Sequence, residues 1–332
     1  MNKIKDFDKL LARQAYRFLR VKLLKEEFAK VFSLRDVLIL NPAFAEDKRN
    51  KYNFFNQNYF SKLIDKVERF WNENPLFKND PQFDENFYKM TDETYFNYIF
   101  SSQNDLGEKI FLPKFEDNTL DLGCGTGFWT NFFYELGVKK ITAVDLSKES
   151  IDINKKRFEY KKNNISFHIQ NCENLHFENE TFDHVNCQGV VHHTPNTQKA
   201  INEIFRVLKR GGKASISVYY KNFLLRNYNY LYPVIKILIK YLGKNLGRGR
   251  DINNLPKDVD DFVRTFDGID NPIGKSYTRQ NFILLLREAG FKNIELDFFF
   301  FPIRFLKIKN VKIVNKISTF LLPFHVVANL HK

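Results

Sequence analysis

The sequence predicts an α/β fold built on a mostly parallel sheet of seven strands. Two observations carry this prediction: short apolar runs alternate with amphipathic helical segments from residue 119 onward, and a glycine-rich turn directly follows the first run. This alternation is typical of parallel sheets that carry helices on both faces. The 332 residues suffice for one large domain, or for a core domain with additions.

The predicted elements follow in chain order. Seven short apolar runs are expected as strands: Thr119–Leu122, Ile141–Asp145, Ile165–Ile169, Phe182–Cys187, Lys213–Tyr219, Asn293–Phe301 and Phe324–Leu330. A helix over 197–209 carries one apolar face and is expected to stop at Gly211-Gly212. Another helix over 278–289 is expected to stop at Gly290.

The N-terminal part has a different pattern. Residues 1–35 predict a basic amphipathic helix, 59–71 another helix, and 76–104 a cap region with short helices. We therefore divide the chain into an N-terminal helical extension and cap, a core and an acceptor-side part that completes the sheet, at residues 1–104, 105–220 and 221–332. Charged residues at the start argue against a secretion signal. The three cysteines lie in no CxxC pattern, so neither disulfides nor a metal site is expected, and we expect a cytoplasmic protein.

Positive charge is concentrated in two apolar stretches. The net charge is +13, and residues 221–250 hold seven basic residues and no acidic one. Such stretches favour anionic partners, and 221–250 with a helical insertion at 303–322 would suit peripheral contact with an anionic membrane surface. A pair of solvated helices explains the pattern equally well. No uncharged apolar run is long enough to span a membrane.

The glycine-rich turn predicts a ligand site. Asp121 precedes Gly123, Gly125 and Gly127, and Asp145 ends the next predicted strand. Glycines allow a sharp turn and a close approach to a ligand. A carboxylate beside the turn would repel a pyrophosphate and suits a ligand with a sulfonium or ammonium group. Asp145 is placed to accept hydrogen bonds from ribose hydroxyls.

Four segments carry a family resemblance: DLGCGTG at 121–127, AVDLS at 143–147, QNCENLHFENETFDHV at 170–185 and GVVHHTPNTQKAINEIFRVLKRGGKASIS at 189–217. Together they resemble the class I S-adenosylmethionine-dependent methyltransferases, in particular the group that includes the ubiquinone and menaquinone C-methyltransferases. The resemblance implies a Rossmann-like sheet with an antiparallel last strand, helical insertions after strands five and six, and S-adenosylmethionine as cofactor.

The resemblance also implies roles for individual residues. The methionine part of the cofactor would lie among the residues of the turn: Asp121, Gly123, Cys124, Gly125 and Gly127. Asp145 would hold the ribose, and Leu146 would lie against the adenine. Asn171 and Cys172 would border the adenine edge, where the family more often has Asp-Ala, and Gln188 would face the sulfonium.

The acceptor side is less specific. His193 or His192 could take a proton from the acceptor, and five tyrosines could line its pocket or pack in the core: Tyr88, Tyr95, Tyr219, Tyr220 and Tyr277. Methyltransferases of base amino groups carry Asn/Asp-Pro-Pro-Tyr/Phe where this chain has Gln188-Gly189-Val190-Val191, and no Pro-Cys nucleophile is present.

A small or lipid-like acceptor is therefore favoured over nucleic acid. Three alternatives stay open: an RNA methyltransferase, which the charge favours, a non-catalytic S-adenosylmethionine-binding protein, and a nicotinamide oxidoreductase. The sequence leaves open whether oxygen, nitrogen or carbon is methylated.

Overall fold

The computed structural model describes residues 61–75, 84–99, 110–161, 164–242, 256–299 and 323–332, with the backbone alone at 94–99, 238–242 and 299. The chain divides into two compact units, residues 1–62 and 63–332, and the second unit carries the sheet. The helices predicted over 1–35 and 303–322 lie outside the described residues.

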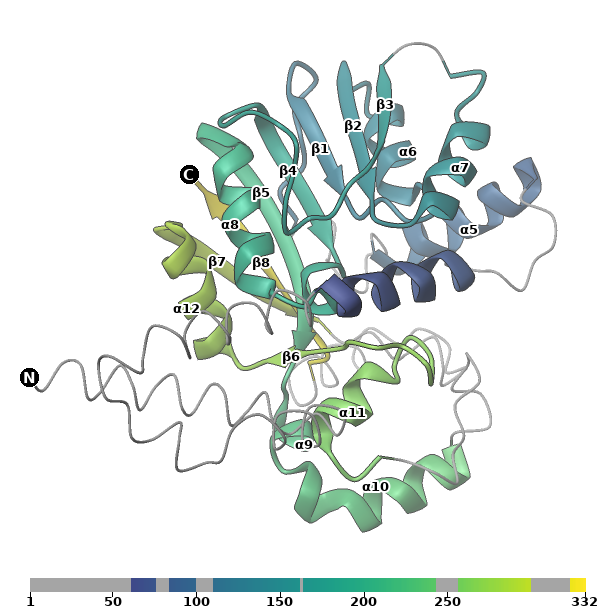
Figure 1. Ribbon diagram of the computed structural model, residues 1–332, viewed down its shortest axis with the longest axis vertical. Coiled ribbons are helices and arrows are strands. Elements are labelled where there is room, and N and C mark those ends of the chain that lie inside the picture. The colour runs from purple at the N-terminus through teal and green to yellow at the C-terminus, as the bar shows by residue number, and fades with distance from the viewer. Residues whose placement is uncertain (1–60, 76–83, 100–109, 162–163, 243–255, 300–322) are drawn as a thin grey trace, which may run out of the picture. The chain divides into compact units, whose positions relative to one another are not determined.

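The sheet confirms the predicted α/β fold. Its order is β3-β2-β1-β4-β5-β8-β7 (Figure 1), with the strands at Asn118–Leu122 (β1), Lys140–Asp145 (β2), Ile165–Ile169 (β3), Phe182–Gln188 (β4), Leu208–Tyr220 (β5), Asn293–Phe299 (β7) and His325–His331 (β8). Strands β1 to β5 pair in parallel. The last strand, β8, is antiparallel to both of its neighbours, as predicted.

Two details differ from the prediction. A short strand, Ser276–Tyr277 (β6), pairs in parallel with Tyr219 and Tyr220 at the end of β5, so the sheet has eight strands among the described residues. The helix predicted over 197–209 ends at Val207, because Leu208 already pairs with Phe182 of β4. Strand pairing there takes the backbone groups that another helical turn would need.

The four helices beside the sheet begin at side-chain caps or glycine. They are Phe128–Glu135 (α6), Lys148–Arg157 (α7), Thr197–Val207 (α8) and Arg279–Ala289 (α12). The side chains of Ser147, Asn196 and Thr278 each accept a hydrogen bond from a backbone amide of the first turn of their helix. Gly290 ends α12 in the left-handed conformation, as the sequence predicts.

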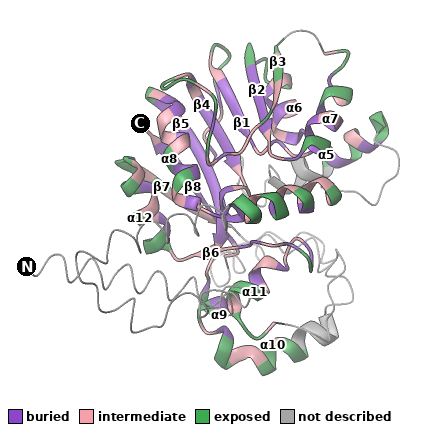
Figure 2. Cartoon of the chain, in the orientation of Figure 1, coloured by how far each residue is buried: buried purple, intermediate pink, exposed green. Residues whose placement is uncertain are grey.

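The core lies along the central strands, which Figure 2 shows as mostly buried. The largest buried cluster joins β1, β4, β5 and β8 to the inner faces of α8 and α12. A smaller cluster of Phe133, Val138 and Ile141 seats α6 against β2. The parallel strands β1, β2, β4 and β5 are largely buried on both faces, whereas the edge strand β3 is partly exposed.

Further helices surround the carboxyl edge of the sheet. They comprise a helix over 61–73, Glu85–Ile99 (α5), the short 3-10 helix Val191–His193 (η2), Phe223–Arg226 (α9), Tyr228–Leu242 (α10) and Val259–Arg264 (α11). The helix over 61–73 agrees closely with the one predicted over 59–71. None of the described helices has the length and apolar character needed to cross a bilayer.

Candidate functional site

The glycine-rich turn joins β1 to α6 at the carboxyl edge of the sheet. Three φ angles in this turn are positive: +79° at Gly123, +53° at Gly125 and +87° at Gly127. Residues other than glycine rarely adopt such angles. The amides of Gly123 and Cys124 donate to the carbonyl of Val144 at the end of β2. The turn is therefore fastened to the neighbouring strand through its backbone.

Asp145 fixes the other side of this turn. Its Oδ2 accepts a hydrogen bond from the amide of Gly125 at 2.9 Å, and its Oδ1 accepts one from the amide of Ser147 at 2.8 Å. Burial raises the pKa of Asp145, and the hydrogen bonds from Ser147 and Gly125 oppose that rise. The carboxylate predicted to bind a ribose thus stands directly beside the turn.

Asp121 lies beneath the turn and is almost completely buried. Its carboxylate accepts hydrogen bonds from Thr130 Oγ1 at 2.6 Å and from Asn186 Nδ2 at 3.0 Å. Burial raises its pKa to about 6 in spite of these bonds. Gln188 Nε2 donates to Asn186 Oδ1 at 3.1 Å, so a chain of polar side chains runs from Asp121 to the end of β4.

Helix α7 supports the turn from outside. Asn154 Nδ2 donates to the carbonyl of Gly125 at 2.6 Å, and Arg157 Nη1 donates to the carbonyl of Thr126 at 2.9 Å. The guanidinium of Arg157 also pairs with Asp92 of α5 and lies over the ring of Tyr88. The sequence analysis did not identify Asn154 or Arg157, because neither belongs to a recognised motif.

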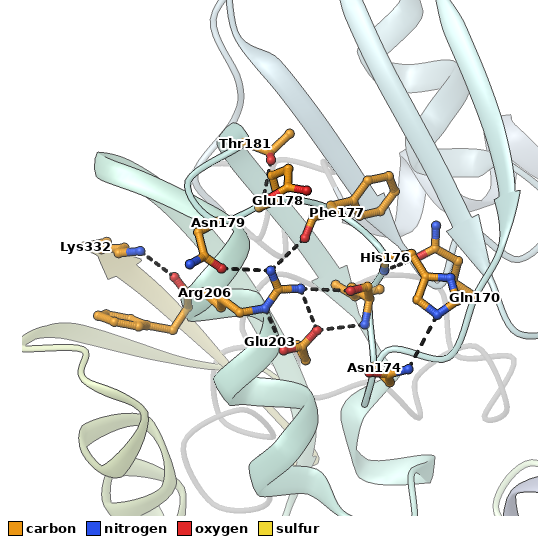
Figure 3. A network of polar contacts seen from close by, with 12 residues as sticks. Gln170, Asn174, His176, Phe177, Glu178, Asn179, Thr181, Glu203, Arg206 and Lys332 are labelled. Carbon is orange, nitrogen blue, oxygen red and sulfur yellow. Dashed lines mark hydrogen bonds and ion pairs between the residues drawn. The ribbon is translucent and has the colours of Figure 1, made fainter.

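The segment predicted to border an adenine lies between β3 and β4 and is held by α8. Arg206 donates to the carbonyls of Leu175 and Phe177, and Glu203 Oε2 accepts from the amide of Leu175 at 2.7 Å (Figure 3). Asn171 Oδ1 accepts a hydrogen bond from the amide of Glu173 and so shapes the turn itself. Cys172 is buried, and burial raises the pKa of its thiol.

The helix over 61–73 connects the ends of two strands. Asn72 Oδ1 accepts hydrogen bonds from Ser147 Oγ at 2.9 Å and from the amide of Glu149 at 3.2 Å, next to the end of β2. The neighbouring Trp71 packs edge-on against the ring of His193, which follows β4, with 5.2 Å between ring centroids. Since β1 lies between β2 and β4, this connection crosses the edge where the glycine-rich turn opens.

The two predicted histidines lie together in η2 and are both buried. Their ring centroids are 4.1 Å apart, and the ring of Tyr219 lies 4.2 Å from that of His192. His193 Nδ1 is 2.7 Å from the carbonyl of Ile273, and Nε2 is 3.2 Å from Oδ2 of Asp267. Tyr219 donates its hydroxyl to the same Asp267 oxygen.

The other four predicted tyrosines have separate surroundings. Tyr277 donates its hydroxyl to Thr197 Oγ1 at 2.8 Å, and Tyr220 packs against Phe298. Successive strand residues face opposite sides of a sheet, so Tyr220 cannot share the orientation of Tyr219. Tyr88 lies under Arg157, and the side chain of Tyr95 is outside the described residues.

The segment over 267–277 holds the turn after β4 in place. The amide of Lys275 donates to the carbonyl of His192 at 3.1 Å, and its ammonium group donates to the carbonyls of Thr194 and Pro195. Burial lowers the pKa of Lys275 to about 8. Asp267 and Lys275 were missed as site residues, although the sequence DGIDNPIGKSYT that contains them could be recognised as an unusual insertion before a helix.

No group of three or more His, Cys, Asp or Glu side chains is arranged to hold a metal ion in the part of the chain that the structure describes. The three cysteines are buried and unpaired with one another.

Comparison with known proteins identifies the same region. A family model described as "Methyltransferase domain" matches residues 120–216. The chain is 32% identical over 215 residues to a demethylmenaquinone methyltransferase of Lactococcus lactis, covering 60% of this chain and 77% of that protein. It is 29% identical over 147 residues to a ubiquinone biosynthesis O-methyltransferase of Coxiella burnetii, covering 44% of this chain.

The solved structures include similar folds. An S-adenosylmethionine-dependent methyltransferase from Mesorhizobium loti aligns with a TM-score of 0.46 and 16% identity over 67% of this chain and 94% of that chain. The match to the Coxiella burnetii protein spans only 56% of that relative. The match to the Lactococcus lactis protein covers 77% of that relative. The chain belongs to the class I S-adenosylmethionine-dependent methyltransferases.

Proposed function

We propose that the protein transfers a methyl group from S-adenosylmethionine to a small, lipid-like acceptor. The observation that carries this proposal is the bond between Asp145 and the amide of Gly125, which joins an acidic strand end to a turn of three glycines. Within the chain, we assign cofactor binding to residues 105–220, capping to 1–104 and acceptor contacts to 221–332.

The residues present fit the cofactor. A side chain at Gly123 or Gly127 would collide with Val190 or Asn154, so the turn must present bare backbone. Around Gly189, which follows β4, a Cβ would meet no atom within 4 Å, and this space adjoins Val190 beside the turn. Two carboxylates, Asp121 and Asp145, border the turn and favour a positively charged ligand.

Each side chain then has a role. Asp121 and the backbone of Gly123, Cys124, Gly125 and Gly127 would bind the methionine part, and Asp145 would accept hydrogen bonds from the ribose. Leu146, Asn171 and Cys172 would contact the adenine. Gln188 would orient the sulfonium side through its hydrogen bond to Asn186.

The bound cofactor supplies a methyl group that its sulfonium already activates. The protein therefore has to align the acceptor, exclude water and, where the acceptor carries a hydroxyl, remove a proton. A histidine of η2, His192 or His193, would serve this last purpose, since η2 directly follows β4, and the one with a nitrogen left unoccupied is the better candidate. Trp71 and Asn72 of the helix over 61–73 would exclude water by lying across the edge of the sheet.

Two observations support a lipid-like acceptor. The relatives from Lactococcus lactis and Coxiella burnetii are named a demethylmenaquinone methyltransferase and a ubiquinone biosynthesis O-methyltransferase, and both names refer to quinones. Helix α10 exposes Tyr230, Val234 and Ile237, which recur on one helical face beside the exposed Lys236. An apolar face with basic residues favours peripheral contact with an anionic bilayer.

The cofactor assignment is tested by titration calorimetry with S-adenosylhomocysteine and, separately, with NAD. We expect binding of the first and none of the second, and the reverse result would overturn the proposal. The acceptor is tested with labelled S-adenosylmethionine and reduced demethylmenaquinone, a total lipid extract, and total RNA. Label transferred to RNA alone would favour the RNA methyltransferase, and cofactor binding without transfer to any pool would indicate a non-catalytic protein.

Membrane contact is tested by co-sedimentation with vesicles of phosphatidylcholine, with and without phosphatidylglycerol. We expect binding that requires the anionic lipid and is lost when Tyr230 and Ile237 are replaced by serine. Leu284→Ser on α12 is the matched control, because Leu284 is 55% exposed and Ile237 is 57% exposed. Equal sedimentation of both variants, or no binding of the unaltered chain, would contradict a membrane role for α10.

A further inference from the structure

The neighbouring histidines of η2 differ in what surrounds their nitrogens. Both nitrogens of His193 face oxygen atoms, the carbonyl of Ile273 at 2.7 Å and the carboxylate of Asp267 at 3.2 Å. Both nitrogens of His193 are therefore held by the protein itself, and Asp267 supplies one of the two contacts.

His192 has the opposite surroundings. It is 1% exposed, and neither of its ring nitrogens has a hydrogen-bond partner among the described residues. Burial holds its pKa well below the usual value, and the charge on His193 acts in the same direction, whereas Asp267 opposes both. His192 is therefore a neutral ring that offers one donor and one acceptor.

A buried polar group without a partner loses its hydrogen bonds to water and gains none in return, so such groups are rare unless a ligand contacts them. Ser276 Oγ is a second such atom in this region. Ser276 is the register partner of Tyr219, and the preceding Lys275 donates its amide to the carbonyl of His192. Among the described residues, two polar groups without a partner thus belong to neighbours of Tyr219: the ring of His192 lies 4.2 Å from its ring, and Ser276 pairs with it along the backbone.

Asp267 links the elements around these groups. Its Oδ2 receives the hydroxyl of Tyr219, at the end of β5, and faces His193, in the turn after β4. Asn271, in the same segment, has its amide nitrogen 3.5 Å from His193 Nδ1. The rings of Tyr219, Phe266 and Phe324 form an aromatic wall on this side.

We propose that Asp267 is the positioning residue of the acceptor site: it fixes His193 as a hydrogen-bonded anchor and leaves His192 to contact a hydroxyl group of the acceptor. This inference rests on the proposed methyl transfer and adds the class of acceptor, a hydroxyl on a planar apolar body. The methyl group would leave the donor's sulfur, which keeps the electron pair of the broken C–S bond, and bond to the acceptor's oxygen. The O–H bond breaks, its electron pair stays on oxygen, and the proton forms a bond to the unprotonated nitrogen of His192.

The first experiment tests the pairing of Asp267 with His193 without any acceptor. The full chain is labelled with ¹⁵N-histidine, and the seven histidines are assigned with the help of His192→Asn and His193→Asn. We expect both nitrogens of His193 to show the shifts of hydrogen-bonded ring nitrogens. Asp267→Asn should abolish that pattern, and Asp270→Asn, at an exposed position of the same segment, should keep it. An unchanged His193 spectrum in Asp267→Asn would overturn the proposal.

The second experiment tests which histidine contacts the hydroxyl. The probe is 1,4-naphthalenediol, added without oxygen to the labelled chain in the presence of S-adenosylhomocysteine. We expect the His192 resonances to move and those of His193 to stay. Dimethoxynaphthalene, which lacks the hydroxyls, should leave both unmoved. A response confined to His193, or none at a saturating concentration of the probe, would contradict the assignment.

The third experiment measures the O-methylated product formed from reduced demethylmenaquinone, and a product methylated on a ring carbon instead would overturn the inference. We expect Asp267→Asn and His192→Asn to lower kcat at least tenfold while the affinity for S-adenosylhomocysteine changes less than twofold, and Asp267→Glu to restore part of the rate. Thermal unfolding shows which variants fold. A normal kcat in folded His192→Asn would overturn the inference. A lack of turnover in the unaltered chain would instead count against the proposed function. The first two experiments would then decide on the roles of Asp267 and His192.

Discussion

The carboxylate of Asp145 accepts a hydrogen bond from the amide of Gly125 at 2.9 Å, which ties the end of β2 to the middle of the glycine-rich turn. The remaining lone pairs of the carboxylate are those that a ribose would use. The turn and its ligand therefore share one anchor, and the loss of that anchor should affect binding more than folding.

We expect Asp145→Ala to weaken the binding of S-adenosylhomocysteine at least thirtyfold, because the substitution removes the ribose acceptors and loosens the amide of Gly125. Gly125→Val should have a similar effect, since its φ of +53° disfavours a branched side chain. Titration calorimetry measures both variants. Asp152→Ala is the control, because Asp152 lies on α7 and pairs with the exposed Lys148. Retained affinity in both site variants would remove the cofactor assignment.

Asp121 should make the protein less stable as the pH rises. Its pKa of about 6 in the folded chain exceeds the ordinary value of 3.8, so the folded state holds the proton more tightly than the unfolded state. The stabilisation is complete below pH 3.8 and is lost as the pH rises through about 6. Its size is on the order of 2–3 kcal/mol.

We therefore expect Asp121→Asn to raise the free energy of unfolding at pH 7.5 relative to the unaltered chain and to lose that advantage at pH 4. Urea denaturation at both pH values measures the difference. The same variant should bind S-adenosylmethionine more weakly, because the negative charge beneath the turn is gone. A difference in stability that does not depend on pH would contradict the buried charge at Asp121.

The turn and the strand ends could be predicted because their signals are local. Glycines at alternate positions and an acidic residue after an apolar run require only a few neighbouring residues. The contact between His193 and Ile273 joins positions 80 residues apart, and no local pattern indicates it. The two residues of β6 are too few for a period of two, so this strand could not be predicted either.

Arg206 illustrates the same limit from the cofactor side. Its position on α8 was assigned to an amphipathic helix, but its guanidinium holds the carbonyls of Leu175 and Phe177 in the segment proposed to border the adenine. We expect Arg206→Ala to raise the KM for S-adenosylmethionine about tenfold with little change in kcat. Arg210→Ala is the matched control, since the Arg210 side chain is 89% exposed and pairs only with Glu180 among the described residues. Equal KM values for the two variants would show that the segment holds its shape without Arg206.

The close contact between Gly123 and Val190 allows the backbone strain of a substitution to be measured separately from its steric collision. Gly123 and Gly211 have nearly equal φ angles, +79° and +76°, but a Cβ at Gly123 would lie 2.1 Å from Val190 Cγ2, whereas one at Gly211 would meet nothing within 4 Å. Gly211→Ala should therefore cost only the backbone strain, about 1–2 kcal/mol in the free energy of unfolding. Gly123→Ala should cost more, and adding Val190→Ala should recover part of the difference, because the colliding methyl groups are removed. Urea denaturation of the three variants and of Val190→Ala completes the cycle. If Gly123→Ala were no more destabilising than Gly211→Ala, Val190 would not pack against the turn. The open space at Gly189, after β4, would then not adjoin the glycine-rich turn, and that support for cofactor binding there would be lost.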